Sequence, residues 1–300
     1  MDGVILLNKP KGVTSHDCVY KIRRLLKTKK VGHTGTLDPD ATGVLPICIG
    51  KATKISSLLS GQSKEYETEI SLGKSTTTED QSGEVIRTLQ VNPNLSIQDC
   101  EHTLKTYIGS ITQIPPMYSA IKVNGKKLYE YAREGIEVER PAREVYIQSI
   151  DMLSKKINWY NNDDARFKFL VNCSSGTYVR TLCVDIGNSL GYPAHMSELK
   201  RTKVGDFSLS ESITLDRLES IVNDGEKVPM ISMANALDLP SITVSDEEAT
   251  RYRHGQVLNY PKRVEGQSMF KVMSSEGDLI AIYKPHPSKH GEAKPFKVFQ

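Results

Sequence analysis

The chain has 300 residues, and its 39 Lys and Arg against 36 Asp and Glu leave a formal net charge of only +3, so any RNA-binding surface has to come from local clusters of cations. A chain of this length predicts two unequal domains rather than one core. The five cysteines form no C-x-x-C pair and no apolar run approaches a membrane span, which argues against a thiolate zinc site and a membrane anchor and leads us to expect a cytoplasmic protein.

The first predicted elements are a short strand at residues 4–7 and an amphipathic helix that begins at Ser15, the expected N-cap. Apolar side chains recur at helical spacing from Cys18 to Leu26 and predict a buried face. The opposite face is basic. Such a face is either solvated or in contact with phosphates, and the sequence leaves both interpretations open.

The helix leads into a glycine-rich loop centred on Asp38, which is followed by Pro39. Glycines at positions 32, 35 and 43 allow backbone dihedrals that other residues avoid, so a tight and rigid loop is predicted. The apolar run at residues 44–49 predicts a buried strand that anchors it. Catalytic groups often lie on such loops, but Asp-Pro is also ordinary turn chemistry. Asp38 is therefore either a catalyst or a turn residue at this point.

Alternating polar and apolar residues predict a half-buried strand over residues 64–73, with Tyr66 as its first inward side chain. An inward aromatic residue is usually part of the core, although it can also form the wall of a site. Residues 74–100 are polar, and we expect a surface connection there. Apolar residues at helical spacing predict a helix over residues 104–111.

The segment at residues 112–145, called the clasp below, combines a double proline, an Asn-Gly turn, cations and tyrosines. The cations include Lys122, Lys126, Lys127, Arg133, Arg140 and Arg143, and the tyrosines are Tyr118, Tyr129 and Tyr131. Aromatic rings stack on unpaired bases and cations pair with phosphates, so a protruding segment of this composition suits an RNA loop. A solvated hairpin followed by a helix has the same composition, and both interpretations stay open.

A strand that ends near residue 173 leads into a helix with Tyr178 and Arg180 in its first turn. An arginine at the start of a helix opposes the helix dipole, at a cost of roughly a few tenths of a kcal/mol. The placement is easier to explain if an anion lies nearby.

The pattern of predicted elements changes near residue 237. From there a short helix and several short strands, separated by glycine and proline, suit a small β-barrel module of about sixty residues. We place the boundary near residue 235. His286 and His290 have a spacing that metals can use on a helix, but the prolines at 285 and 287 argue against a helix, and we expect no metal site.

Six separated blocks follow one another in the chain: LNKPKG, GHTGTLDP, KEY, PPMYSAIK, SGTYVR and a last block formed by His195 with LKR. In sequence and order they resemble bacterial tRNA pseudouridine synthases of the TruB type, which act on the uridine at position 55 in the T-arm loop of tRNA. The resemblance extends from Leu7 to about Phe207. Asp40 departs from it, since family members often carry an apolar residue there, and we expect the change to be tolerated.

The resemblance implies that Asp38 is the catalytic carboxylate, that Arg180 is its charge partner and favours its ionised form, and that Tyr66 stacks on the target base and is a candidate for proton transfer. It also implies pocket or substrate-binding roles for Lys9, Pro10, His33, Lys122, Tyr178, Leu199 and Arg201. The implied reaction is an isomerisation in which the bond from base to ribose breaks, the uracil turns and a carbon–carbon bond forms. It needs no cofactor or metal. Because the target lies in a folded loop, we expect the enzyme to flip it out.

For the fold, the resemblance implies an α+β pseudouridine-synthase architecture with a mixed, mostly antiparallel central sheet. It implies a catalytic domain at residues 1–235 that contains the clasp, and a PUA-like RNA-binding domain, a small β-barrel, at residues 236–300. A Rossmann-type sheet is the competing interpretation of the N-terminal elements, but the glycine fingerprint is absent. The expected partner is the tRNA T-arm, without guide RNA or protein partner, and we expect a monomer.

Two other functions compete with this one. The chain is alternatively a tRNA-binding or tRNA-folding protein whose modifying activity is incidental, because RNA binding would use the clasp and the C-terminal module rather than Asp38. It is alternatively a related synthase that acts on another RNA. Activity and tRNA-folding assays of an Asp38 variant distinguish the first alternative from a tRNA pseudouridine synthase. A comparison of RNA substrates distinguishes the second.

Overall fold

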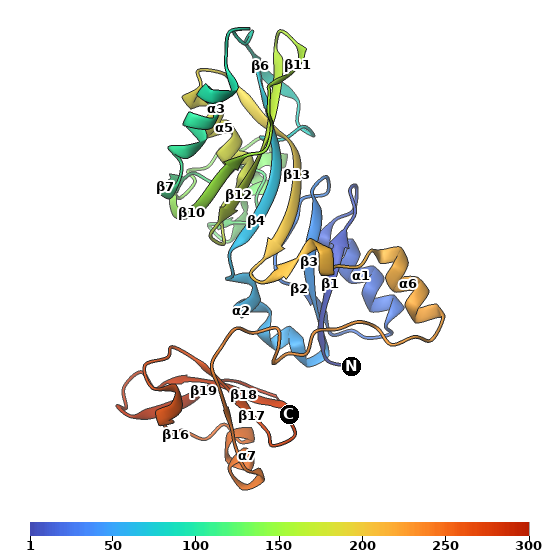
Figure 1. The fold of residues 1–300 in the computed structure, drawn as a ribbon, viewed down its shortest axis with the longest axis vertical. Helices are drawn as coiled ribbons and strands as arrows, with labels where there is room; N and C mark the ends of the chain where they lie inside the picture. The colour runs from blue at the N-terminus through green and yellow to red at the C-terminus, as the bar shows by residue number, and fades with distance from the viewer. Residues whose placement is uncertain (300) are drawn as a thin grey trace.

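A ten-stranded mixed sheet organises the larger part of the computed structural model, which describes residues 1–299 (Figure 1). In spatial order its main strands are β1 (Gly3–Lys9), β3 (Thr42–Ile49), β13 (Ala194–Val204), β4 (Lys64–Leu72), β12 (Asp164–Cys173), β10 (Arg143–Met152) and β7 (Gly109–Gln113). The strands β2 (Val31–His33), β11 (Asn158–Asn161) and β14 (Phe207–Ser208) pair at its margins. Only β13 and β3 run parallel among the pairs described in this sheet. The predicted α+β class with a mixed, mostly antiparallel sheet is confirmed.

Helices cover one side of this sheet and close its core. They are α1 (Ser15–Leu25), α3 (Ile97–Lys105), α5 (Val179–Ser189) and α6 (Leu215–Asn223). Each presents an apolar stripe to the sheet, as its amphipathic sequence requires. Thr14, not Ser15, is the N-cap of α1: its hydroxyl accepts a hydrogen bond from the amide of Asp17 at 3.0 Å. The expected cap was therefore wrong by one residue, and Ser15 lies buried at the first helical position.

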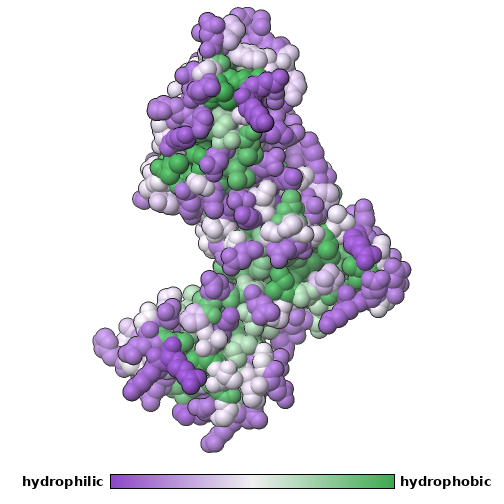
Figure 2. Space-filling view, viewed as in Figure 1, coloured by the Kyte–Doolittle hydropathy of each residue, from purple (hydrophilic) through white to green (hydrophobic). Residues whose placement is uncertain are grey.

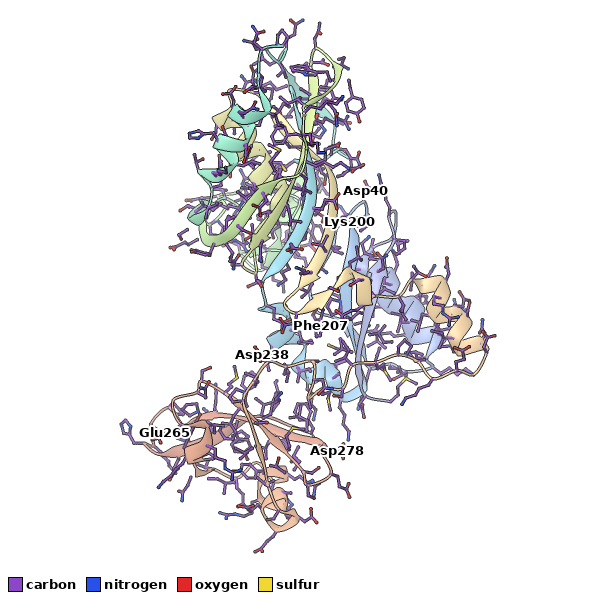
Figure 3. All side chains as sticks on the ribbon, viewed as in Figure 1. Asp40, Lys200, Phe207, Asp238, Glu265 and Asp278 are labelled. Atoms are coloured by element: carbon purple, nitrogen blue, oxygen red, sulfur yellow. The ribbon has the colours of Figure 1, made fainter. Side chains whose placement is uncertain are left out.

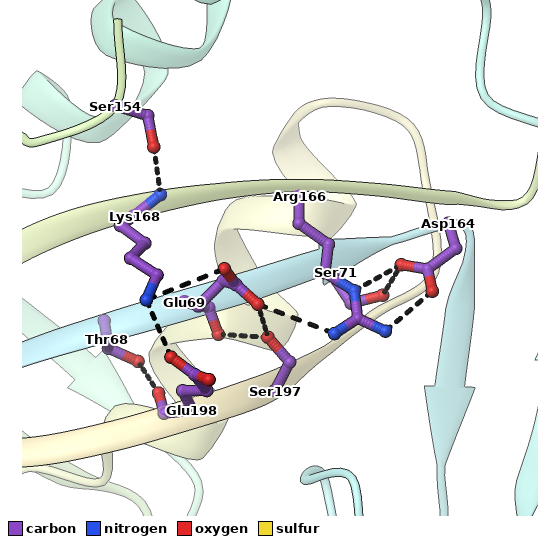
Figure 4. Close-up of polar contacts among 9 residues, drawn as sticks. All are labelled: Thr68, Glu69, Ser71, Ser154, Asp164, Arg166, Lys168, Ser197 and Glu198. Carbon is purple, nitrogen blue, oxygen red and sulfur yellow. Dashed lines mark hydrogen bonds and ion pairs between the residues drawn. The ribbon is translucent and has the colours of Figure 1, made fainter. Parts of the chain in front are cut away.

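Part of the face of the sheet away from α5 carries charged side chains in a cross-strand ladder (Figure 4). Arg166 of β12 bonds Asp164 at 2.6 Å and approaches Glu69 of β4 at 3.5 Å, while Lys168 bonds Glu198 of β13 at 2.7 Å. Individually such pairs contribute about 0.2–1 kcal/mol, but here they also satisfy groups on three central strands. Glu69 is buried although its side chain points away from the helices, because the ladder covers it.

Two hairpins project from the sheet. The first joins β5 (Lys74–Thr76) to β6 (Val85–Thr88), and the second joins β8 (Lys122–Val123) to β9 (Lys126–Lys127) before α4 (Leu128–Arg133). Asn124 and Gly125 both have positive φ, 51° and 82°, which the tight turn of the second hairpin requires. The predicted Asn-Gly turn within the clasp is confirmed.

The C-terminal part forms a separate, curled five-stranded sheet at one end of the molecule (Figure 1). Its strands, in spatial order, are β15 (Ser241–Thr243), β17 (Phe270–Met273), β18 (Leu279–Pro285), β19 (Glu292–Val298) and β16 (Leu258–Asn259), accompanied by α7 (Asp246–Arg253) and the short helix η3 (Lys262–Val264). A small C-terminal β module was predicted, and this sheet confirms it. The boundary near residue 235 and the PUA-like identity stay predictions.

The two sheets share one apolar cluster of buried residues, which lies around η1 (Gly50–Ile55) and α2 (Ser56–Ser60). Figure 2 shows apolar surface where the C-terminal part joins the rest of the molecule. Ile55 and Leu59 from these helices meet Leu279, Ile282 and Phe299 of the C-terminal part. The short helix η2 (Leu209–Glu211) follows β14 and precedes α6. Within residues 1–299 we find no helix that is both long and apolar enough to span a bilayer.

Two further predictions of local structure were wrong. The helix expected over residues 104–111 lies earlier, at Ile97–Lys105, with Ser96 as its N-cap, and the chain turns at Gly109, whose φ is +107°, into strand β7. The helical spacing of the later apolar residues was therefore accidental. Residues 74–100 are also more than a surface connection, because the turn of the β5–β6 hairpin reaches the functional cleft described next.

Candidate active site

A cleft with a volume of about 440 Å³ opens between the Asp38 loop, the start of α5 and the clasp. Its walls bring together residues that are far apart in the chain. They include Thr34, Asp38, Lys64, Tyr66, Tyr118, Ser119, Tyr129, Tyr178, Arg180, Leu199 and Arg201. The central sheet forms its floor through Tyr66 on β4 and Arg201 on β13, which are direct partners in the strand pairing.

The Asp38 loop is fixed from behind by buried side chains. Ser15 accepts a hydrogen bond from the Leu37 amide at 2.9 Å and donates one to its carbonyl at 3.0 Å. Lys9, which is fully buried, donates to the carbonyls of Val13 at 2.6 Å and Pro39 at 3.0 Å. The residues on both sides of Asp38 are thus anchored, so its carboxylate is presented by a rigid backbone.

Arg201 supports the same loop from the floor of the cleft. Its side chain is 1% exposed, and it donates to the carbonyl of Val44 at 2.7 Å and to that of Gly35 at 3.2 Å. Gly43 has a φ of +107°, and a Cβ atom there would lie 2.1 Å from the Arg201 carbonyl oxygen. This close approach explains why the loop ends in glycine.

Asp38 and Arg180 form an ion pair that lines the cleft. The Nε atom of Arg180 lies 3.1 Å from Oδ2 of Asp38, and the arginine side chain is only 6% exposed, whereas 38% of the aspartate side chain faces the cleft. Arg180 also donates to the carbonyls of Thr78 and Tyr118, both at 2.9 Å. Its Nη1 atom lies 3.7 Å from the carboxylate of Asp80. The anion suggested by the arginine at the helix start is therefore Asp38.

Burial raises the pKa of Asp38 above its usual range, because the surrounding protein disfavours the charged carboxylate. Arg180 acts in the opposite direction and lowers this pKa, while the charge of Asp80 raises it further. The predicted influence of Arg180 has the expected sign, but the effect of burial is larger.

Tyr66 lies beside this pair, almost fully buried at the floor of the cleft. Burial raises the pKa of its phenol, and the positive charge of Arg201 lowers it. A phenol with a raised pKa keeps its proton at neutral pH. Its ring borders the cleft near Leu199, so both a stacking surface and a proton are available there.

The other predicted site residues fall into three groups. Tyr178 and Leu199 line the cleft beside Asp38. Lys9 lies behind the loop, as Arg201 lies beneath it, while the adjacent Pro10 is exposed. His33 and Lys122 do not line the cleft among the residues described: the Nδ1 atom of His33 accepts from the Gly35 amide at 3.3 Å, and Lys122 is exposed on the β8–β9 hairpin. Their proposed contacts with substrate stay predictions.

Several residues at the site escaped sequence reasoning. Thr78 holds Arg180 through a carbonyl, and a carbonyl contact leaves no trace in residue type. Thr34 and Ser119 border the cleft with buried hydroxyls that have no hydrogen-bond partner within residues 1–299. Lys64 also borders it, and burial lowers the pKa of its amine to about 8. For Thr34, Lys64 and Ser119 the signal was their membership of the GHTGTLDP, KEY and PPMYSAIK blocks.

Two solved structures share this fold over nearly the whole chain. A crystal structure of a Cbf5-Nop10-Gar1 complex aligns with a TM-score of 0.73 and 29% identity, covering 99% of this chain and 85% of the other. A structure of an H/ACA RNP bound to a substrate RNA containing 2′-deoxyuridine aligns with a TM-score of 0.71 and 27% identity over the same shares. The chain therefore shares the fold of the proteins in these two structures.

The sequence comparisons identify the family of the chain. Residues 23–179 match the model of the TruB family pseudouridylate synthase N-terminal domain, and residues 180–236 match that of the tRNA pseudouridylate synthase B C-terminal domain. Proteins named tRNA pseudouridine synthase B from Halalkalibacterium halodurans and Bacillus subtilis are 52% and 53% identical, with 99% of this chain and 97% of each relative covered. The chain belongs to the TruB family of pseudouridylate synthases.

Proposed function

We propose that this protein converts uridine to pseudouridine in tRNA, with Asp38 as the catalytic carboxylate. The observation that carries the proposal is the Asp38–Arg180 pair, 3.1 Å apart, which lines an open cleft and in which Asp38 is held by a rigid loop. The relatives that cover the whole chain are named tRNA pseudouridine synthase B, which supports tRNA as the substrate.

The reaction rearranges bonds without adding atoms. The bond between N1 of uracil and C1′ of ribose breaks, the base turns, and a bond forms between C5 and C1′. A proton leaves C5 and another is gained at N1. Asp38 supplies the negative charge or the nucleophile for the first step, whether it attacks the sugar, adds to the base or starts a route through a glycal. Tyr66 lies where it can stack on the base and exchange a proton.

We further propose that the target is the uridine at position 55 in the T-arm loop, and that it is flipped into the cleft. Asp38 lines the cleft, and a base has to leave the stack of a folded RNA loop to enter it. The clasp stands beside the cleft opening with cations over aromatic rings, such as Lys127 and Arg133 over Tyr129 at 5.2 Å each. These groups suit an RNA backbone with exposed bases.

The test is pseudouridine formation by the purified protein on a T-arm transcript, compared with a ribosomal RNA fragment. Asp38→Asn keeps the size of the side chain and should lower the single-turnover rate by about a thousandfold or more. Asp40→Asn makes the same change on the exposed neighbour (Figure 3) and should leave the rate near that of wild type. Full activity of Asp38→Asn would overturn the assignment of the carboxylate.

The same assay examines the proposed independence from other components. Activity of the purified chain on a transcript alone would establish that neither guide RNA nor a protein partner is needed. A requirement for either would overturn that part of the proposal. Light scattering of the enzyme–RNA complex measures whether the chain acts as a monomer.

A role in tRNA folding is a second candidate, favoured by cation–aromatic pairs remote from Asp38. In the C-terminal module, Lys284 of β18 and Lys297 of β19 lie 5.3 Å and 5.5 Å from the ring centroid of Phe296 of β19. Such a surface can hold RNA without modifying it. Refolding of misfolded tRNA by Asp38→Asn at the wild-type rate would establish this role separately from catalysis. Loss of refolding in that variant would overturn it as an independent function.

A further inference from the structure

Both ends of the clasp meet at one point of the central sheet. Gln113, at the end of β7, and Arg143, at the start of β10, are direct partners in the antiparallel pairing of these strands. Both side chains contact residues 176–178, the turn that begins α5. Arg180 follows this turn by two residues, so the base of the clasp is attached beside the arginine that holds Asp38.

Gln113 binds the backbone of Tyr178 at two atoms. Its side-chain nitrogen donates to the Tyr178 carbonyl at 3.2 Å, and its side-chain oxygen accepts from the Tyr178 amide at 3.0 Å. Gln113 is 1% exposed, so water does not compete for these bonds. Tyr178 is the N-cap of α5 and makes no side-chain capping bond. A primary amide is the side chain that offers both donor and acceptor here, and it fixes the backbone where the helix starts.

Arg143 holds the same turn from the other end of the clasp. It donates to the Gly176 carbonyl at 3.3 Å, and its guanidinium lies 5.2 Å from the Tyr178 ring centroid. A third contact comes from within the clasp, where the Tyr118 carbonyl accepts from Arg180 at 2.9 Å. The clasp thus touches the start of α5 through both of its ends and touches Arg180 itself.

We propose that Gln113 and Arg143 are positioning residues that transmit the position of the clasp to Arg180, and through Arg180 to Asp38. The inference rests on the proposed function, because it concerns the same carboxylate. RNA held by the clasp fixes the turn at residues 176–178, and the fixed turn keeps Arg180 against Asp38. Without this attachment the clasp still binds RNA, but Arg180 is less well aligned, and misplacement of a catalytic contact lowers the rate.

The decisive variant is Gln113→Met, which keeps the length of the side chain and removes its donor and acceptor. We expect the single-turnover rate at saturating enzyme to fall by about tenfold or more, with the RNA dissociation constant within about twofold of wild type. In an Arg180→Lys background the same change should cost less than about threefold, because the positioned group is already altered. An equal loss in both backgrounds, or no loss in either, overturns the inference.

Two further variants separate positioning from folding. Ser110→Ala removes an exposed hydrogen bond to Glu144 in the same strand pair without reaching α5, and it should behave as wild type. Arg143 is only half-buried, so we expect Arg143→Met to fold. Its single-turnover rate should fall, as that of Gln113→Met does. If Arg143→Met is stable and has the same rate as wild type and Ser110→Ala, the inference is overturned, even if Gln113→Met fails to fold.

Amide hydrogen exchange gives a readout that does not depend on activity. Binding of a T-arm transcript should slow exchange in residues 176–182 of wild type and Ser110→Ala, but not of Gln113→Met. Equal protection in all three proteins overturns the inference. A wild type that shows this protection but makes no pseudouridine would instead contradict the proposed function and leave the attachment of the clasp intact.

Discussion

At the scale of single residues, the pKa of Asp38 is set by opposing influences of unequal size. Burial raises its pKa most, Arg180 opposes this, and Asp80 adds to it from the far side of the guanidinium. The same Asp80 helps to hold Arg180, so its charge has two consequences for the site. It improves the alignment of the arginine and also disfavours the ionised form of Asp38.

This balance predicts a pH effect. If ionised Asp38 is the reactive form, the single-turnover rate rises with pH through the pKa of Asp38, and burial places that midpoint above the ordinary value of 3.8. Asp80→Asn removes a negative charge that opposes ionisation of Asp38, so the pKa of Asp38 should fall. The acidic limb of the pH–rate profile should therefore move to lower pH. The measurement is the rate profile at constant ionic strength, with folding followed by circular dichroism.

Asp40→Asn is the matched control for this profile. Asp40 also raises the pKa of Asp38, but as the weakest of the influences identified, so its removal should shift the limb less than removal of Asp80. A limb that stays in place in Asp80→Asn, or that moves to higher pH, would contradict the balance described here.

At the scale of elements, the site residues predicted from sequence came from segments with strong local patterns. The glycine-rich loop, the alternating strand with Tyr66 and the helix start with Arg180 were all recognisable, and the structure brings Asp38, Tyr66 and Arg180 to one cleft. The parallel pairing of β13 with β3 was not derivable, because Arg201 and Gly43 are distant in the chain and neither has a pattern that names its partner.

The missed contacts share a physical reason. Thr78 and Tyr118 hold Arg180 through main-chain carbonyls, which every residue type offers, so no composition could have indicated them. Ser15 was expected to cap α1 because its residue type fits that position. The preceding Thr14 fits as well and takes it, which leaves the Ser15 hydroxyl to hold Leu37. Residue type alone cannot decide between neighbouring caps.

Two lysines of the β8–β9 hairpin should contribute differently to the salt dependence of RNA binding. Lys122 is exposed and makes no ion pair within residues 1–299, whereas Lys126 is paired with Glu134. If Lys122 contacts a phosphate, Lys122→Gln should reduce the slope of log Kd against log salt by about one. Lys126→Gln changes the net charge equally and should reduce it less. Equal slopes for both variants and wild type, measured by fluorescence anisotropy, would contradict a phosphate contact at Lys122.

At the scale of the whole molecule, the C-terminal module is fixed to the rest of the chain by a continuous core. Lys271 of β17 donates to the carbonyls of Ala234 at 2.9 Å and Leu237 at 2.8 Å, so the connecting segment is also held. Phe299 lies in the shared apolar cluster, and Lys54 of η1 bonds the adjacent Val298 carbonyl at 2.9 Å. The module therefore holds a fixed position relative to the central sheet.

A shared core predicts that both parts unfold together, so calorimetry of the wild type should give one cooperative transition. Phe299→Ala removes a buried ring from the junction and should lower the free energy of unfolding by about 3–5 kcal/mol. Phe296→Ala, three residues earlier on β19 and only partly buried, is the matched control and should cost less. Two separate transitions in the wild type, with only one of them moved by Phe299→Ala, would mean that the module is tethered rather than fixed. The clasp and the module would then have to reach the RNA independently.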